Sequence, residues 1–450
     1  SELASAGGRR IDWWAGLRVP LAVTLGLVAG TPGRVTRDLS KILQPGQQGL
    51  IALDTVERVV VEPVTRSRFL PAALTINGLL GVLYAWSLFL APLEALLGLS
   101  RAEVSVAPSV ALFCVTVGVF FHDDLLRRLS LRWLVASVLG LAGAGHLLFW
   151  MFPTYPVLIA GYGVMFGLAI GVGFGVALGL ARTARTPPSG WYVGSVAAMF
   201  AGSGMSISVV GAAIGVLDPV ILFGAIGVMF IIAGGLLALA LSGKVFPTSA
   251  ADSHSGDATA TRTVGFWCLF WGNFAMCYAG LMFISHGSAL LTSFGLSANE
   301  ASWAPFASNL GYVFGALFGG VVAAKFPGKR TPLLFGVATL LAVLMFSVPG
   351  LVVFKLIALG VVGASFGSTV SVFMMLFTLW YGIDSAGRLF GRLNVGYGLA
   401  GFVAPSVTGW LFDYGGSYHN AVLACVVLML IGCLAIALSP PPRRRAGLDT

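Results

Sequence analysis

Residues 155–181 are YPVLIAGYGVMFGLAIGVGFGVALGLA, a run without a single charged side chain. As an α-helix, this run is long enough to cross the hydrocarbon core of a bilayer, which is about 30 Å thick. Small residues on one helix face let a neighbouring membrane helix approach closely. Glycine recurs here at four-residue steps, which places on one face Gly163, Gly167, Gly171, Gly175 and Gly179. The run predicts a transmembrane helix whose smooth face serves tight packing, sliding against a neighbour, or both.

The composition of the whole chain extends this interpretation. Apolar residues make up 57% of the 450 positions, charged residues make up 10%, and the mean hydropathy is +0.93. A soluble domain carries about 25% charged residues, because its surface faces water. Most of the surface of this chain is therefore expected to face lipid, and the net charge of +9 does not indicate a nucleic-acid partner.

Eleven further apolar runs have a length comparable to that of 155–181. The first six runs of the chain lie at 69–96, 104–122, 133–152, 155–181, 191–217 and 218–242. The second six lie at 266–293, 300–326, 331–349, 351–381, 389–412 and 420–439. The sequence predicts an all-α membrane protein with twelve transmembrane helices. These helices are expected to form two pseudo-symmetric six-helix bundles, at residues 66–242 and 265–440. A cytoplasmic loop at 243–264 joins the two bundles.

The basic residues of the loops predict the orientation. When the loops are taken in order, one side holds Arg66, Arg68, Arg127, Arg128, Arg132, Arg182, Arg185, Lys244, Arg262, Lys325, Lys329, Arg330, Arg388, Arg392 and Arg443 to Arg445. The other side holds only Arg101 and Lys355. By the positive-inside rule, both termini are expected in the cytoplasm of a plasma (inner) membrane, with residues 441–450 as a cytoplasmic tail.

Residues 1–65 lie before the first long run. Their apolar stretch from Trp13 to Gly30 is interrupted by Arg18 and Pro20. We interpret the segment as a basic cytoplasmic extension; an interfacial helix or an additional span are the alternatives.

An offset of 202 residues superimposes the two predicted bundles. Gly118 is followed by Arg127 and Arg128, and Gly320 is followed at the same spacing by Lys329 and Arg330. The same offset brings the fourth run onto the tenth and the fifth onto the eleventh. Two related six-helix halves are the arrangement of many secondary transporters, which bind their substrate at the interface between the repeats.

Polar and aromatic residues inside the apolar runs are the candidates for a substrate site, because burying them requires a partner or a water-filled cavity. Amides and phenols that face a central cavity can hydrogen-bond and stack on a solute; hydrogen bonds between helices are the alternative role. The eleventh run is the clearest, because Asn394, Tyr397 and Pro405 share a face. The candidate substrate-binding residues are Asn77, Tyr84, Trp86, Tyr278, Asn309, Tyr312, Asn394 and Tyr397.

Ionisable residues inside the runs are few. His146 and His286 are the candidates for a proton relay, although a buried neutral histidine is the more common role. Lys355 is expected to extend its amine to the outer interface. No metal-ligand spacing, nucleophile elbow or phosphate-binding loop occurs, so we expect no enzyme, no metal and no cofactor.

The sequence resembles the major facilitator superfamily, and within it the oxalate/formate antiporter and monocarboxylate porter branch. Over residues 66–440, the likeness is carried by Asn77 to Phe89 (NGLLGVLYAWSLF) and by Gly363 to Gly367 (GASFG), Gly396 to Gly398 and Gly409 to Asp413. The resemblance implies a carrier of small organic anions. The branch's oxalate carriers hold the dianion with basic residues in the eighth and eleventh spans. Here the eighth span has none, and Tyr397 aligns with the lysine of the eleventh.

The expected function is therefore secondary active transport by alternating access. The solute is expected to be a monocarboxylate-like anion or a neutral or zwitterionic metabolite, moved by a monomer in the bilayer with a coupling proton as a possible second partner. The alternative is a membrane sensor or assembly factor that keeps the carrier fold without transporting.

Overall fold

The computed structural model describes residues 69–182, 189–214, 218–242, 261–347 and 352–441. Within these ranges all the regular secondary structure is helical. The predicted extension 1–65, most of the predicted loop 243–264 and the tail from residue 442 onwards lie outside the described residues.

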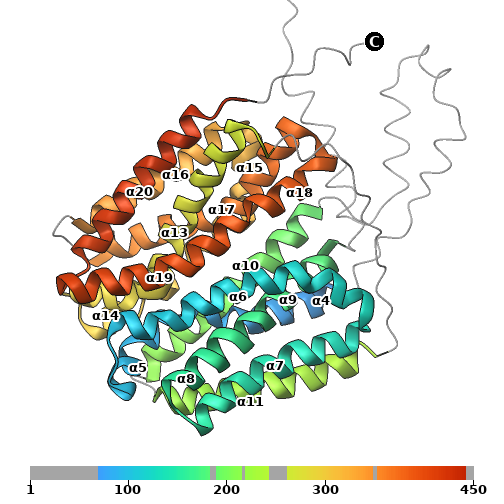
Figure 1. Ribbon diagram of the computed structural model, residues 1–450, viewed down its shortest axis with the longest axis vertical. Helices are drawn as coiled ribbons and strands as arrows, with labels where there is room; N and C mark the ends of the chain where they lie inside the picture. Colours follow the sequence, from blue (N-terminus) through green and yellow to red (C-terminus); the bar gives the residue numbers. More distant parts are fainter. Residues whose placement is uncertain (1–68, 183–188, 215–217, 243–260, 348–351, 442–450) are drawn as a thin grey trace, which may run out of the picture. The chain divides into compact units, whose positions relative to one another are not determined.

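The helices follow the predicted runs. Those of the N-terminal half are α4 (Leu70–Leu80), η1 (Gly81–Leu88), α5 (Leu90–Leu97), α6 (Arg101–Arg128), α7 (Leu131–Met151), α8 (Tyr155–Leu158), η2 (Ile159–Phe166), α9 (Gly167–Arg182), α10 (Ser189–Ile214) and α11 (Pro219–Ala240). Those of the C-terminal half are α13 (Val264–Ser293), α14 (Ala298–Ala301), α15 (Ala304–Lys325), α16 (Arg330–Leu344), η3 (Met345–Ser347), α17 (Val352–Tyr381), α18 (Ile383–Leu393), α19 (Val395–Gly415) and α20 (His419–Leu438). Figure 1 shows the two halves as two groups of helices, blue to green and yellow to red.

Among the described residues, eleven helical segments are long and apolar enough to cross a membrane, and α10 adds the shorter apolar helix Gly194–Val210. Together they correspond to the twelve predicted spans. Several spans combine consecutive elements: α4, η1 and α5 form the first, α8, η2 and α9 the fourth, and α18 and α19 the eleventh. The predicted all-α, twelve-helix architecture is confirmed.

Short polar sequences determine where several of these helices begin. The Ser100 hydroxyl accepts from the backbone N–H of Glu103, and the Glu103 carboxylate accepts from the backbone N–H of Ser100. Ser297 and Glu300 repeat this capping box before α14. Such caps satisfy backbone donors that the first helical turn leaves without partners. The helices α6 and α14 therefore begin at defined residues, Arg101 and Ala298.

Glycines allow close packing within each half. A Cβ atom added at Gly171 of α9 would lie 2.8 Å from the Cα atom of Gly118 on α6, so only glycine fits there. In the C-terminal half, a Cβ atom added at Gly315 of α15 would lie 2.9 Å from the backbone nitrogen of Ser368 on α17. The predicted glycine face of the fourth run thus packs tightly against α6.

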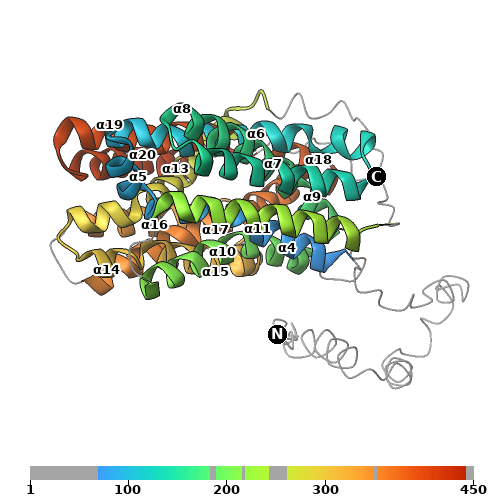
Figure 2. The same cartoon turned by 90° about the horizontal axis from the view of Figure 1, so that it is seen from below.

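The most extensive contacts between the two halves are made by two pairs of helices. α6 packs against α19, and α10 packs against α15. The offset of 202 residues relates α6 to α15 and α10 to α19, so it exchanges one pair for the other. This exchange is the pattern expected of two structural repeats around a pseudo-two-fold axis. In the turned view of Figure 2, the long helices of both halves run in roughly the same direction.

The helical body has two ends, which are named here after residues of α6. The Arg101 end is the end at which α6 begins, and the Arg128 end is the one at which α6 finishes. The loop charges predict that the Arg101 end faces the outside.

Candidate functional site: a tyrosine cluster and a polar network between the halves

Three of the predicted site tyrosines come together between the halves. Tyr84 on η1 comes from the N-terminal half, Tyr312 on α15 and Tyr397 on α19 come from the C-terminal half, and all three rings contact Phe366 on α17. The rings of Tyr84 and Tyr312 are 5.5 Å apart in an edge-to-face arrangement. Tyr84 and Tyr312 are buried, whereas Tyr397 is half-buried. We call Tyr84, Asn309, Tyr312, Phe366 and Tyr397 the tyrosine cluster.

Phe366 on α17 forms the aromatic wall of the tyrosine cluster. Its ring stacks on Tyr397 with a centroid distance of 6.1 Å and an interplanar angle of 7°. It also meets Tyr312 edge-on at 5.4 Å. On the N-terminal side, Phe200 of α10 contacts Tyr84 edge-on at 4.8 Å. The cluster therefore combines phenol hydroxyls with aromatic faces from both halves.

Asn309 of α15 links the two halves at the same level. Its Nδ2 atom donates to the backbone carbonyl of Tyr84 at 3.2 Å. Its side chain is completely buried, and its Oδ1 atom has no hydrogen-bond partner. A buried amide oxygen without a partner is costly, so a donor on a bound solute or a water molecule would be favoured at this atom.

The predicted site residue Asn394 lies next to the tyrosine cluster on the chain. Asn394, at the junction of α18 and α19, is half-buried and lies one helical turn from Tyr397. Val395 and Leu399, on the same stretch, are 56% and 41% exposed. α18 packs on α13, α17 and α19, all within its own half. Asn394 therefore lies close to the tyrosine cluster, at the start of α19.

Three other predicted site residues lie elsewhere. The Asn77 side chain donates from Nδ2 to the carbonyl of Val196 at 2.6 Å, within the N-terminal half. Trp86 packs on Tyr162 with ring centroids 4.7 Å apart, also inside that half. Tyr278 lies beside Thr408, inside the C-terminal half. The structure thus separates these three from the tyrosine cluster.

His146 lies in an aromatic core of the N-terminal half. Its Nδ1 atom donates to the backbone carbonyl of Ala142, four residues earlier on α7, at 2.8 Å. Rings of Phe166, Phe223 and Phe230 surround the imidazole at centroid distances of 4.6, 5.2 and 5.3 Å. These contacts are those of a packed, hydrogen-bonded core histidine.

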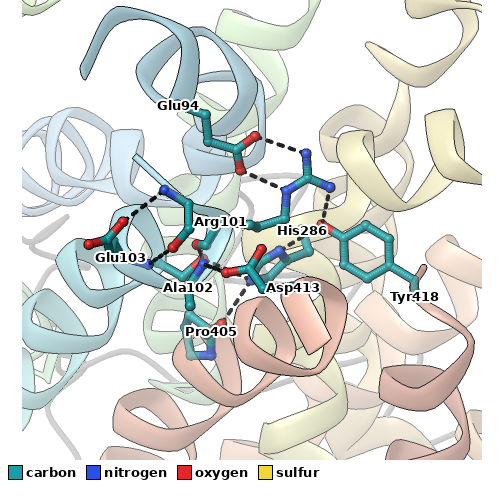
Figure 3. A network of polar contacts seen from close by, with 10 residues as sticks. Glu94, Arg101, Ala102, Glu103, His286, Pro405, Asp413 and Tyr418 are labelled. Atoms are coloured by element: carbon teal, nitrogen blue, oxygen red, sulfur yellow. Dashed lines mark hydrogen bonds and ion pairs between the residues drawn. The ribbon is translucent and has the colours of Figure 1, made fainter. Parts of the chain in front are cut away.

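His286 has polar partners instead, at the Arg101 end (Figure 3). Its Nε2 atom lies 2.9 Å from the carbonyl oxygen of Pro405, and its Nδ1 atom lies 2.9 Å from the hydroxyl of Tyr418. The same hydroxyl accepts from Nη1 of Arg101 at 3.2 Å. Arg101 in turn donates to both carboxylate oxygens of Glu94, at 2.7 and 2.9 Å. We call Glu94, Arg101, His286 and Tyr418 the Arg101 network.

The Arg101 network joins the halves of the protein. Glu94 and Arg101 belong to the N-terminal half, and His286 and Tyr418 to the C-terminal half. The guanidinium group lies 3.9 Å from the ring centroid of Phe412, so it enters the C-terminal half between aromatic rings. The side chains of Arg101 and Glu94 are only 14% and 18% exposed. A bidentate pair in this shielded position is stronger than an exposed one.

Further contacts between α6 and α19 close the same end. The backbone N–H of Ala102 donates to Asp413 at 2.8 Å, and the hydroxyls of Ser109 and Ser406 are 2.7 Å apart. A Cβ atom at Gly409 would lie 2.9 Å from the Cα atom of Ala102. The halves are therefore in direct backbone contact at the Arg101 end.

Lys355 is distant from the tyrosine cluster. Its amine lies 3.5 Å from the carbonyl oxygen of Phe294, the residue that ends α13, and 4.8 Å from the centroid of the Phe294 ring. A cation at this place complements the negative end of the α13 dipole. Its observed contacts are those of a helix cap.

Sequence reasoning did not select Phe366, Phe200, Arg101 or Tyr418 as site residues. Phe366 lies in the GASFG segment, which carries part of the family resemblance. That resemblance is the sequence feature by which Phe366 could have been selected. Arg101 was visible as one of two basic residues on the sparsely charged side. Phe200 and Tyr418 had no signal of their own, because their partners come from distant parts of the chain.

A family profile described as the Major Facilitator Superfamily matches residues 269–449. No curated protein matches the sequence of the chain. The resemblance to the oxalate/formate and monocarboxylate branch stays a prediction.

Among solved structures, the fold is similar to that of a bacterial homolog to a human lysosomal transporter, Spinster. The inward-facing and occupied form gives a TM-score of 0.63 at 17% identity and covers 83% of this chain and 96% of that chain. The inward-facing and unoccupied form gives the same score and identity, covering 84% and 97%. At this identity the likeness concerns the fold. The chain is an integral membrane protein with the twelve-helix, two-bundle fold of the major facilitator superfamily.

Proposed function

We propose that the protein is a secondary transporter that carries a small organic solute across a membrane by alternating access of its two halves. The tyrosine cluster supports this proposal above all, because it places hydroxyl, amide and aromatic groups from both halves at their interface. A site built from two halves changes its exposure when the halves rock against each other. Both similar solved structures are described as homologs of a transporter.

The chemistry of the cluster supports a substrate class. Its members are uncharged: three tyrosines, one asparagine and one phenylalanine. Phenol hydroxyls can donate to a single carboxylate, and the free Oδ1 atom of Asn309 can accept from an N–H or O–H group. A dianion would need cationic partners that these five residues lack. The proposed solute is a monocarboxylate-like anion or a neutral or zwitterionic metabolite, with a donor group and an apolar part.

Uptake by proteoliposomes tests the proposal. The purified protein is reconstituted and assayed for accumulation and for counterflow exchange with monocarboxylates, amino acids and neutral metabolites, with and without an imposed proton gradient. The expected result is saturable uptake of at least one of these compounds and no uptake of oxalate. If no compound accumulates or exchanges while the protein remains folded, a sensor or assembly role replaces transport.

A further inference from the structure

The hydrogen bonds of His286 define its protonation state in this conformation. The carbonyl of Pro405 can only accept, so Nε2 must carry the proton that it donates across 2.9 Å. The Tyr418 hydroxyl accepts from Arg101 and has one proton to donate, and Nδ1 of His286 lies 2.9 Å away. When the imidazole is neutral, Nδ1 accepts a hydrogen bond from the Tyr418 hydroxyl. Each side chain of the Arg101 network then has a hydrogen-bond partner.

A second proton on the imidazole disrupts this hydrogen-bond arrangement. Nδ1 would then become a donor to the same Tyr418 oxygen that already accepts from Arg101, and the hydroxyl proton would lose its acceptor. Two cations would also share one phenol oxygen in a buried position, where like charges repel strongly. Glu94 cannot compensate for the second cation, because both its oxygens already bind Arg101.

The other ionisable groups around α13 have different partners. Asp413 of α19 accepts from the backbone of Ala102, and Glu300 of α14 is exposed and accepts from Ser297. Lys355 of α17 and His419 of α20 both lie against Phe294, about two helical turns from His286. Tyr84 of η1 and Tyr312 of α15 belong to the tyrosine cluster. The group in direct contact with the imidazole on the N-terminal half is Ser105, at 3.4 Å from Nε2.

We propose that His286 is a proton-binding site that controls the opening of the Arg101 end. The neutral imidazole completes the Arg101 network and holds the halves together. The protonated imidazole displaces Arg101 and releases α6 from α19. Acid on the side that the Arg101 end faces therefore favours the conformation open to that side. This inference rests on the proposed movement of the two halves, and it adds the group that senses the proton.

Distances between spin labels across the Arg101 end test the inference. Labels are attached at Ala95→Cys on α5 and Asn299→Cys on α14, two exposed positions on opposite halves, after replacement of the native cysteines. Double electron–electron resonance is recorded in nanodiscs at pH 8.0 and pH 5.5. This range covers protonation of an imidazole in water, near pH 6.5, and leaves ordinary carboxylates ionised.

The expected result is a longer-distance population whose equilibrium constant rises about tenfold from pH 8.0 to pH 5.5, if the open state alone binds the proton. His286→Gln keeps a donor for Pro405 and an acceptor for Tyr418 without titrating, so its distances should not change with pH. His286→Asn serves the same purpose if the glutamine variant does not fold. The matched control His419→Gln should respond as the parent does.

Two results would overturn the inference: no acid-dependent lengthening in the parent, or equal lengthening in both the parent and the His286 variants. The distances are measured without any solute. A protein that opens with acid but takes up no compound would thus contradict the proposed transport function and leave the role of His286 intact.

Discussion

Tyr397 is the half-buried tyrosine of the tyrosine cluster, and its ring stacks on Phe366, which also contacts Tyr84 of the other half. In Tyr397→Phe the ring can still stack on Phe366, but the hydroxyl is lost. One hydrogen bond contributes about 1 kcal/mol, so we expect the initial rate of uptake to fall about fivefold. The measurement is radiolabelled uptake in proteoliposomes with matched protein content.

Tyr414→Phe is the control for this substitution. Tyr414 lies on the same helix, α19, and is 80% exposed. It should transport at the parental rate. Unchanged uptake by Tyr397→Phe would remove the phenol hydroxyl from the proposed site. Asn394→Ala, one turn away, is expected to reduce uptake as well without loss of folded protein.

Substitution of Lys355 is expected to change the stability of the protein and not its transport. Because its amine interacts with the end of α13, Lys355→Gln should lower stability by about 0.3–1 kcal/mol, the usual contribution of a charge at a helix end. The Michaelis constant for the solute should not change. A thermal-shift assay and uptake kinetics separate the two effects, and a large increase in the Michaelis constant would make Lys355 part of an anion site instead.

At the scale of helices, the contact between α6 and α9 depends on glycine. Gly171→Ala places a methyl group 2.8 Å from the Cα atom of Gly118, and the three atoms nearest to that methyl group are all backbone atoms, which cannot rotate away. Overpacking of this kind costs about 1–3 kcal/mol. We expect a lower melting temperature and less protein that elutes as a single species in detergent.

Gly140→Ala is the matched control, because a Cβ atom at Gly140 of α7 meets nothing within 4 Å. It should melt at the parental temperature or slightly above, since alanine favours helix over glycine. Equal melting temperatures for the two variants would show that α9 can shift away from α6 without cost, which favours the sliding role of the glycine face.

At the scale of the whole molecule, transport by alternating access requires α6 and α19 to separate at the Arg101 end. The hydroxyls of Ser109 and Ser406 are 2.7 Å apart, which is compatible with a bridge between Cβ atoms about 4 Å apart. The double variant Ser109→Cys/Ser406→Cys should form a disulfide under oxidising conditions and lose uptake.

Reduction with dithiothreitol should restore uptake in this double variant, and each single variant should transport in both conditions. Mass spectrometry of the digested protein confirms the bridge. Full uptake by the oxidised double variant would show that the two halves need not part at α6 and α19 during transport.

The number and order of the helices were predictable from the sequence. A membrane helix satisfies its own backbone hydrogen bonds, so an uncharged run such as 155–181 specifies its structure locally. The glycine spacing predicted that Gly171 faces a neighbour. It did not identify that neighbour as α6, because periodicity assigns residues to a face but not a face to a partner.

The candidate site was predicted only in part, for the same reason. Asn77 and Trp86 belong to the same first span as Tyr84, yet they face the interior of the N-terminal half. The span includes the 3₁₀ element η1, whose tighter winding rotates side chains relative to an α-helix. The candidate residues of this one span therefore do not share one surface.

By itself the sequence determined the membrane fold, the twelve spans, the repeat of 202 residues and the predicted orientation, because hydropathy and loop charge act on each segment separately. Only the tertiary structure decided which polar side chains meet. Tyr84, Tyr312 and Tyr397 come from three different spans, and the Arg101 network joins residues more than 300 positions apart, as between Arg101 and Tyr418. Such contacts depend on how the two halves dock, and no local pattern in the chain records that geometry.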